Sequence, residues 1–149
     1  VIMMRAGVIL YNLNMKQLLL IHRWKNGKEY FVIPGGGVNL NETVLQAAQR
    51  EIREELGWTL SEKMLKSAFS FQNTDKLEVY FFTAISDRPA PAIQGEELLR
   101  SHHYNRYQPE WIMIDKLDQL NLQPVTLKNL LLEFLIQEGL KKEGNYSKI

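Results

Sequence analysis

The glutamates Glu51, Glu54 and Glu55 have the spacing i, i+3 and i+4, which places them on one side of an α-helix. Carboxylates this close repel one another, and the dipole near the C-terminal end of a helix also disfavours negative charge. A hard divalent cation such as Mg²⁺ or Mn²⁺ would remove the repulsion, because these ions prefer oxygen ligands and retain water and substrate phosphates. We therefore interpret the three glutamates as candidate metal ligands. The simpler alternative is a solvated acidic helix face.

A helix over residues 44–56 is predicted to position these acids. Thr43 and Gln46 form a capping-box pattern at its start, and Gly57 fits the position just after its end. At 100° per residue the apolar side chains gather in one sector, next to the acidic one. This sector predicts the face that packs on the core, and it contains Leu45, Ala48, Ile52 and Leu56.

Two arginines of the same helix have different expected roles. Arg50 lies one turn before Glu54 and can hold that carboxylate by a charge-assisted hydrogen bond. Arg53 points away from the acidic side and is expected to be solvated.

Three glycines, Gly35, Gly36 and Gly37, follow a short predicted strand and precede the helix. A glycine backbone lets a ligand approach closely, and such a loop offers N–H donors to a phosphate and a carbonyl to a metal. Alone, the glycines indicate only a tight turn. Together with the carboxylates they predict a site for a metal and a phosphate, and Arg23, at the end of a strand near this loop, is a further candidate for binding substrate.

Residues 36–58 resemble the complete Nudix box of the Nudix hydrolase (MutT-like) family. Five residues separate Gly36 from Glu42 and seven separate Glu42 from the run Arg50-Glu51-Ile52-Arg53-Glu54-Glu55-Leu56-Gly57-Trp58. The resemblance implies an α/β fold, a Nudix-type α/β/α sandwich with a mixed β-sheet, in a single domain over residues 1–140. It also implies a pyrophosphohydrolase that acts on phosphorus-containing acid anhydrides. Such an enzyme cleaves a diphosphate bond in a nucleoside diphosphate linked to another moiety, by attack of water on phosphorus.

The same resemblance assigns roles to the residues of the box. It implies that Glu51, Glu54 and Glu55 are ligands of Mg²⁺ or Mn²⁺, and that one of them also deprotonates the attacking water. Glu54, Glu55 and Arg50 are the expected catalytic residues, with Arg50 orienting a box glutamate.

The resemblance also implies a role for the backbone around these acids. A carbonyl of Gly35 or Gly36 is expected to reach the metal, while Gly35, Gly36 and Gly37 contact the substrate. Glu42 is expected to brace the loop against the helix, and Gly57 is a structural residue of the box.

Residues 86–109 form a long segment with little periodicity, which in a compact domain favours a functional or disordered connection. Several family members place a further acid outside the box, so Glu97, beside Glu96, is a candidate metal ligand. Aromatic and arginine side chains of this segment could stack on a base or pair with phosphate, or they could pack the segment onto its own domain. These side chains, with two histidines, are His102, His103, Tyr104, Arg106 and Tyr107.

Apolar runs and turn signals predict the remaining elements. Strands are expected over residues 6–11, 17–24, 30–33, 66–71, 77–85 and 110–115, and a last helix over 125–137, with a frayed tail over 141–149. The early strands read as hairpins, so a mixed sheet is expected and a purely parallel one is not.

The overall composition excludes several classes of protein. The chain has 149 residues, no cysteine and a net charge of +1, which exclude disulfide scaffolds and thiolate zinc sites and disfavour general nucleic-acid binding. No apolar run approaches the roughly 20 residues that span a bilayer. We expect a cytoplasmic protein whose partner is a small nucleotide or nucleotide derivative, with no membrane partner, and which could form the homodimer common in this family.

Two rival functions remain open on the same fold. A non-catalytic nucleotide-sensing module would usually lack a box carboxylate, and this chain retains them all. An isopentenyl-diphosphate isomerase-like enzyme would need a nucleophilic cysteine, which is absent. The sequence signals beyond the box that mark hydrolases of ADP-ribose, dinucleoside polyphosphates, coenzyme A or NADH are missing, so a small MutT-like nucleotide hydrolase is the residual class.

Overall fold

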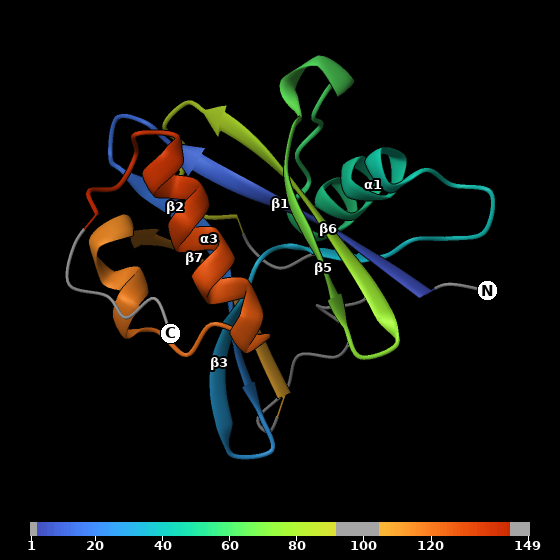
Figure 1. Cartoon of the computed structure of the whole chain (residues 1–149), viewed down its shortest axis with the longest axis horizontal. Helices are drawn as coiled ribbons and strands as arrows, with labels where there is room; N and C mark the ends of the chain where they lie inside the picture. The colour runs from blue at the N-terminus through green and yellow to red at the C-terminus, as the bar shows by residue number, and fades with distance from the viewer. Residues whose placement is uncertain (1–2, 92–104, 144–149) are drawn as a thin grey trace.

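The computed structural model describes residues 3–91 and 105–143 (Figure 1). Its helices are α1 (Val44–Leu56) and α3 (Val125–Gln137), with short 3-10 turns at η1 (Glu62–Met64) and η2 (Ile114–Gln119). Its strands are β1 (Met3–Asn12), β2 (Gln17–Lys25), β3 (Lys28–Val32), β4 (Gly35–Gly37), β5 (Lys66–Asn73), β6 (Lys76–Ile85) and β7 (Asn105–Met113).

The described strands form one mixed sheet with the order β3-β2-β1-β6-β5, to which β4 adds beside β1 and β7 beside β2. β1 and β6 run parallel, and the other paired strands are antiparallel. β1 and β2 pair only at Tyr11↔Leu18 and Asn12↔Gln17 and then diverge. The glycine strand β4 pairs with the free edge of β1 beyond this point, at Arg5, Ala6 and Gly7.

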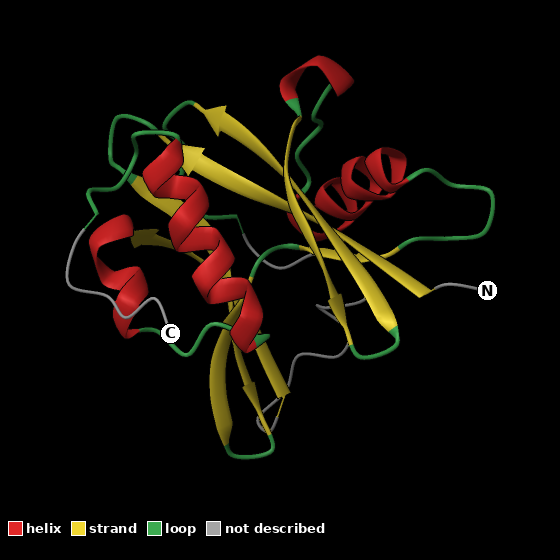
Figure 2. Ribbon diagram, in the orientation of Figure 1, coloured by secondary structure: helices red, strands yellow, loops and turns green. Residues whose placement is uncertain are grey.

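The sheet lies between helices, as the layers in Figure 2 show. β1 alternates between two cores: Ile9 and Tyr11 join the core under α3, whereas Val8 and Leu10 join the core under α1. Alternate residues of a strand point to opposite faces, so a strand buried on both sides reads as a continuous apolar run. The α/β sandwich with a mixed sheet is thereby confirmed.

Local sequence signals account for the ends of α1. The Thr43 side chain accepts the N–H of Gln46 at 3.0 Å, and the Gln46 side chain accepts the N–H of Thr43 at 2.9 Å. Gly57 ends the helix in the left-handed conformation, at φ 73°, where a residue without a Cβ is favoured. The helix therefore begins and ends at the predicted residues.

Three expectations about the strands were wrong in detail. The glycine segment is a short strand rather than a free loop, because β1 offers it an unpaired edge. β7 begins at Asn105, inside the segment expected to be irregular, because it pairs with β2 from Asn105↔Lys25 to Met113↔Gln17. The chain then enters η2, so Asp115 lies in a 3-10 turn and not in a strand.

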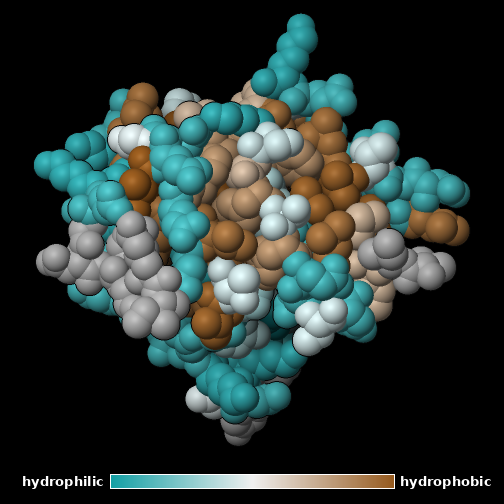
Figure 3. Space-filling model, viewed as in Figure 1, coloured by the Kyte–Doolittle hydropathy of each residue, from teal (hydrophilic) through white to brown (hydrophobic). Residues whose placement is uncertain are grey.

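Hydrophobic and hydrophilic side chains are segregated on the face seen in Figure 3, with apolar residues over β5 and β6 and hydrophilic ones at the tip of the β2–β3 hairpin. Within the described part of the chain, no helix has the length and apolar character needed to cross a membrane. At the end of the chain, Lys141 forms an ion pair with Asp118 at 3.6 Å. The rest of the expected frayed tail lies mostly outside the described residues.

Candidate active site

Arg50 holds the loop before α1 against the acidic side of the helix. Its guanidinium donates to both carboxylate oxygens of Glu42, at 2.7 and 2.9 Å, and to the carbonyl of Gly37 at 2.9 Å. It also donates to Glu51 at 2.9 Å and to Glu54 at 3.3 Å. The hydrogen bonds from Arg50 lower the pKa of Glu42, and the Glu42 carboxylate in turn raises the pKa of Arg50. The expected bond to Glu54 is present, and the bracing of Glu42 is the stronger contact.

Glu55 differs from the other two glutamates because it is buried, with 7% of its surface exposed. Its carboxylate accepts the backbone N–H of Gly35 at 3.1 Å, so it ties α1 to the glycine strand. The three acids therefore do not form one solvated helix face: Glu54 is exposed, Glu51 is half-buried and Glu55 is buried. Arg53 is exposed, as expected.

A polar network of Arg5, Glu78 and Tyr80 lies near Glu55, and it was not predicted from the sequence. Arg5 donates to the carbonyl of Ile33 at 2.8 Å and lies near Glu55, Glu78 and Tyr80. Burial by itself lowers the pKa of Arg5, but the nearby Tyr80, Glu55 and Glu78 outweigh burial, and the net pKa is raised. Burial raises the pKa of the Tyr80 phenol, because burial disfavours the charged phenolate. The Tyr80 hydroxyl donates to Glu78.

The network was missed because its members come from different strands. Arg5 lies on β1 and Glu78 on β6, and the two are cross-strand partners in the parallel pair. A spacing pattern within one element cannot reveal such a pair. The available signal was a single arginine and a single glutamate, each inside an otherwise apolar strand.

The glycines allow close packing at two different points. A Cβ on Gly36 would lie 2.3 Å from the carboxyl carbon of Glu51, so this carboxylate occupies the space beside the Gly36 backbone. A Cβ on Gly35 would lie 2.2 Å from the carbonyl oxygen of Ala6. A Cβ on Gly37 would meet no atom within 4 Å.

A cavity of about 620 Å³ joins these elements. Glu51 and Glu54 lie on one side of it with the three glycines, and Arg5, Arg23 and Lys25 also line it. The Arg23 guanidinium lies 4.2 Å from the centre of the Tyr107 ring and donates to the Tyr107 hydroxyl. Its Nε is buried without a hydrogen-bond partner among the described residues. The cavity therefore brings carboxylates and cationic groups to one place.

The donor chemistry around this cavity fits a hard dication, since the carboxylate oxygens of Glu51 and Glu54 share its lining. Over residues 3–91 and 105–143, no group of three or more His, Asp or Glu side chains is already arranged to hold a metal ion. Arg50 donates to Glu51 and Glu54, and Gly35 donates to Glu55. Each carboxylate has further lone pairs that these hydrogen bonds do not use.

Of the candidates in the long segment, Arg106 and Tyr107 are described. Tyr107 is buried in the core under α1, and the Arg106 guanidinium lies 4.7 Å from the centre of the Trp24 ring. Both side chains thus pack on their own domain. The other candidates of that segment, Glu96, Glu97, His102, His103 and Tyr104, lie outside the described residues.

Comparison with known structures agrees with this architecture. The chain is similar to MutT from a study of Aliivibrio salmonicida and Vibrio cholerae, with 20% identity, a TM-score of 0.68 and coverage of 91% of this chain and 98% of the other. It is similar to a C. elegans Ap4A hydrolase, with 20% identity, a TM-score of 0.65 and coverage of 91% and 98%. It is also similar to a MutT protein from Methanosarcina mazei Go1, with 19% identity, a TM-score of 0.62 and coverage of 93% and 96%. These similarities show a shared fold.

Comparison with protein families is more direct. No curated protein sequence matches the chain significantly. A family model described as the NUDIX domain matches residues 2–130, which include every residue of the box and the whole described cavity. The chain therefore belongs to the NUDIX domain family, and the enzyme class expected from its sequence, a Nudix pyrophosphohydrolase, is confirmed at the level of the family.

Proposed function

We propose that this protein hydrolyses a diphosphate bond in a nucleoside diphosphate linked to another moiety, with the help of Mg²⁺ or Mn²⁺. The observation that carries the proposal is the composition of the 620 Å³ cavity, where Glu51 and Glu54 face the same space as Arg23 and Lys25. Carboxylates bind the dication, and cationic groups bind the phosphate oxygens that it does not neutralise. The names of similar structures, which include MutT, Ap4A hydrolase and ADP compounds hydrolase, support a nucleotide compound as substrate.

Each residue of the site has a proposed role in the reaction. Glu51, Glu54 and Glu55 would hold the dication, which when bound neutralises charge on phosphate oxygens and lowers the pKa of water. Arg50 keeps the loop and the helix in a fixed relation. Arg23 would donate from its guanidinium to a phosphate oxygen, and one box glutamate would accept the proton of the attacking water.

An assay in which added pyrophosphatase and phosphatase convert the products to inorganic phosphate tests this proposal. The purified chain is incubated with Mg²⁺ or Mn²⁺ and a panel of nucleoside triphosphates, ADP-ribose, dinucleoside polyphosphates and nucleotide sugars. We expect Glu54→Gln to lower kcat/KM by roughly a hundredfold or more, the size of effect found when one group that stabilises transition-state charge is removed. Glu62→Gln changes an exposed acid in η1 and is the matched control.

Binding of Mn²⁺, followed by its electron paramagnetic resonance signal, gives a second readout. Glu54→Gln should weaken Mn²⁺ binding, whereas Glu62→Gln should not. Normal turnover by Glu54→Gln would show the ligand assignment to be wrong. Inactivity of the unaltered chain on the whole panel with either metal would favour the nucleotide-sensing module instead.

A further inference from the structure

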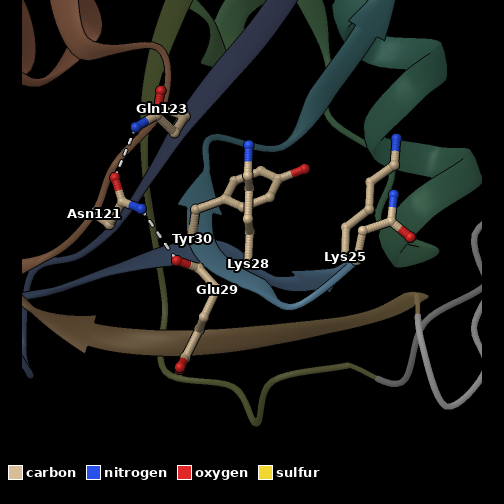
Figure 4. Close-up of a pocket in the computed structure, with 7 residues that line it drawn as sticks. Lys25, Lys28, Glu29, Tyr30, Asn121 and Gln123 are labelled. Atoms are coloured by element: carbon tan, nitrogen blue, oxygen red, sulfur yellow. Dashed lines mark hydrogen bonds between the residues drawn. The ribbon is translucent and has the colours of Figure 1, made fainter.

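A second cavity, of about 760 Å³, lies at the β2–β3 hairpin and is not part of the catalytic assignment above (Figure 4). We call it the hairpin cavity. Its volume is in the range of small-molecule binding sites, which is roughly 300–1,000 Å³. The residues that matter for its chemistry are Lys25, Lys28, Glu29, Tyr30, Asn121 and Gln123.

The hairpin cavity adjoins the cavity proposed as catalytic, because two side chains connect their linings. Lys25 lines both cavities. Arg23 lines the catalytic cavity, and its guanidinium lies 5.5 Å from the centre of the Tyr30 ring in the hairpin cavity. Arg23 and Tyr30 are also cross-strand partners. A ligand whose phosphates lie in the catalytic cavity can therefore extend past Lys25 into the hairpin cavity.

The positive charges of two lysines in the hairpin cavity favour the binding of an anion. Lys25 and Lys28 are directly opposite each other in the β2–β3 ladder, where like charges are destabilising. Within the described part of the chain, neither lysine forms an ion pair. Glu29 is turned toward His22, to which its carboxylate bonds at 2.7 Å, and Figure 4 shows it pointing away from both lysines. An anion placed between the lysines would remove their repulsion.

The remaining groups suit a flat ring with hydrogen-bonding edges. Figure 4 shows the Tyr30 ring between Lys25 and the amides of Asn121 and Gln123, with the Lys28 side chain crossing the ring in this view. The Asn121 amide donates to the carbonyl of Glu29 at 3.1 Å, and the Asn121 Oδ1 accepts from the amide of Gln123 at 2.7 Å. These two hydrogen bonds fix the orientation of Asn121. The Oε1 of Gln123 and the hydroxyl of Tyr30 have no partner among the described residues. Aromatic side chains stack on nucleobases, and side-chain amides read their edges.

We propose that the hairpin cavity binds the second nucleotide of a substrate in which a chain of phosphates joins two nucleosides. Lys25 and Lys28 bind phosphate oxygens beyond the cleaved bond, Tyr30 stacks on the base, and Gln123 accepts a hydrogen bond from its edge. This assignment rests on the proposed function and names its substrate class as dinucleoside polyphosphates.

Equilibrium binding tests the cavity separately from catalysis. Diadenosine tetraphosphate, ATP and ADP are titrated by calorimetry in EDTA, where metal-dependent turnover cannot run. We expect Lys28→Gln and Tyr30→Ala each to weaken the binding of diadenosine tetraphosphate by about tenfold, since each removes one contact to the far nucleotide. The affinity for ADP should change by less than twofold. Lys63→Gln, at an exposed lysine of η1, is the matched control.

The possible outcomes separate the two proposals. The cavity assignment would be overturned if the variants bound ADP and diadenosine tetraphosphate equally more weakly, or if they bound both ligands as tightly as the unaltered chain does. If Lys28→Gln weakened ATP as much as diadenosine tetraphosphate while Tyr30→Ala weakened neither, the cavity would hold only a phosphate, and the nucleotide assignment would be wrong. If the expected binding differences appeared but no metal supported hydrolysis, the cavity would stand and the proposed hydrolysis would fall.

Discussion

Arg50 connects the segment before α1 to the acidic side of the helix, because one guanidinium bonds to Glu42, to the carbonyl of Gly37 and to two box glutamates. A planar guanidinium with several donors can do this, whereas the ammonium group of lysine cannot bond in the same fork geometry. Arg50 therefore sets the position of the glutamates without needing to contact a substrate.

Glu55, a proposed metal ligand, is also expected to contribute to stability, since its buried carboxylate lies near the guanidinium of Arg5. Glu55→Gln keeps the shape but removes the charge that offsets Arg5, so we expect a loss of about 1–3 kcal/mol in the free energy of unfolding. Glu54→Gln, at an exposed neighbour, should change it by less than about 0.5 kcal/mol. Urea unfolding of both variants measures the difference, and equal stabilities would contradict the buried network.

Gly36 and Gly37 offer a matched pair of substitutions. A Cβ on Gly36 would displace the Glu51 carboxylate, whereas a Cβ on Gly37 would enter open space. We expect Gly36→Ala to lower kcat/KM by at least tenfold, since a small misplacement of a catalytic group is costly, and Gly37→Ala to lower it less than twofold. Steady-state kinetics on the best substrate of the panel checks this. Similar losses in both variants would show that Glu51 does not depend on the space beside Gly36.

At the scale of the elements, α1 and α3 could be predicted to the residue because helix ends are set by local groups: a capping box and Gly57 for α1, and Pro124 before α3. The strands could not be bounded as well. Whether residues 105–109 or the glycines join a sheet depends on edges that distant strands leave open, and no local pattern records this. The same limit applied to the site, where the helical acids were found and the cross-strand pair of Arg5 and Glu78 was missed.

The cap of α1 gives a prediction for this element. Thr43→Ala removes the oxygen that accepts the N–H of Gln46, and loss of such a cap costs about 0.5–2 kcal/mol. We expect the free energy of unfolding to fall by this amount, with kcat/KM changed much less because Arg50 and the box glutamates of the helix lie at least one turn beyond the cap. Thr59→Ala, at an exposed threonine just after the helix, should leave both quantities unchanged. A stable Thr43→Ala variant would mean that tertiary packing alone holds the start of α1.

For the molecule as a whole, the two cavities differ in the elements that line them. β1 and β2 separate after two residue pairs, and β1 pairs with β4 and β6 while β2 pairs with β3 and β7. The cavity proposed as catalytic has residues of both sets in its lining, with Gly36 from the first and Arg23 from the second. The hairpin cavity is lined by the β2–β3 hairpin together with Asn121 and Gln123, which lie between η2 and α3. Among the described residues, none of α1 lines the hairpin cavity, so we expect substitutions there to leave α1 in place.

The stability of the molecule in acid should depend on the contact between Glu42 and Arg50. Arg50 lowers the pKa of Glu42 in the folded state, so the folded chain takes up this proton less readily than the unfolded chain. The contribution of this contact to the free energy of unfolding is therefore fully present above the ordinary glutamate pKa of about 4.3. It is lost as the pH falls through the lowered pKa of Glu42 in the folded state. Glu42→Gln should unfold more easily than the unaltered chain above about pH 5, and this difference should shrink below about pH 4.

Urea unfolding at a series of pH values measures that difference, with Glu62→Gln as an exposed control. If the gap between the unaltered chain and Glu42→Gln stayed constant from neutral to acid pH, the stabilisation would come from the shape of the hydrogen bonds and not from the charge of Glu42. A shrinking gap would identify the loop–helix brace as one of the contacts whose protonation leads to acid unfolding. The glutamates of the box would then lose their positions along with the fold, because Arg50 holds Glu42, Glu51 and Glu54 together.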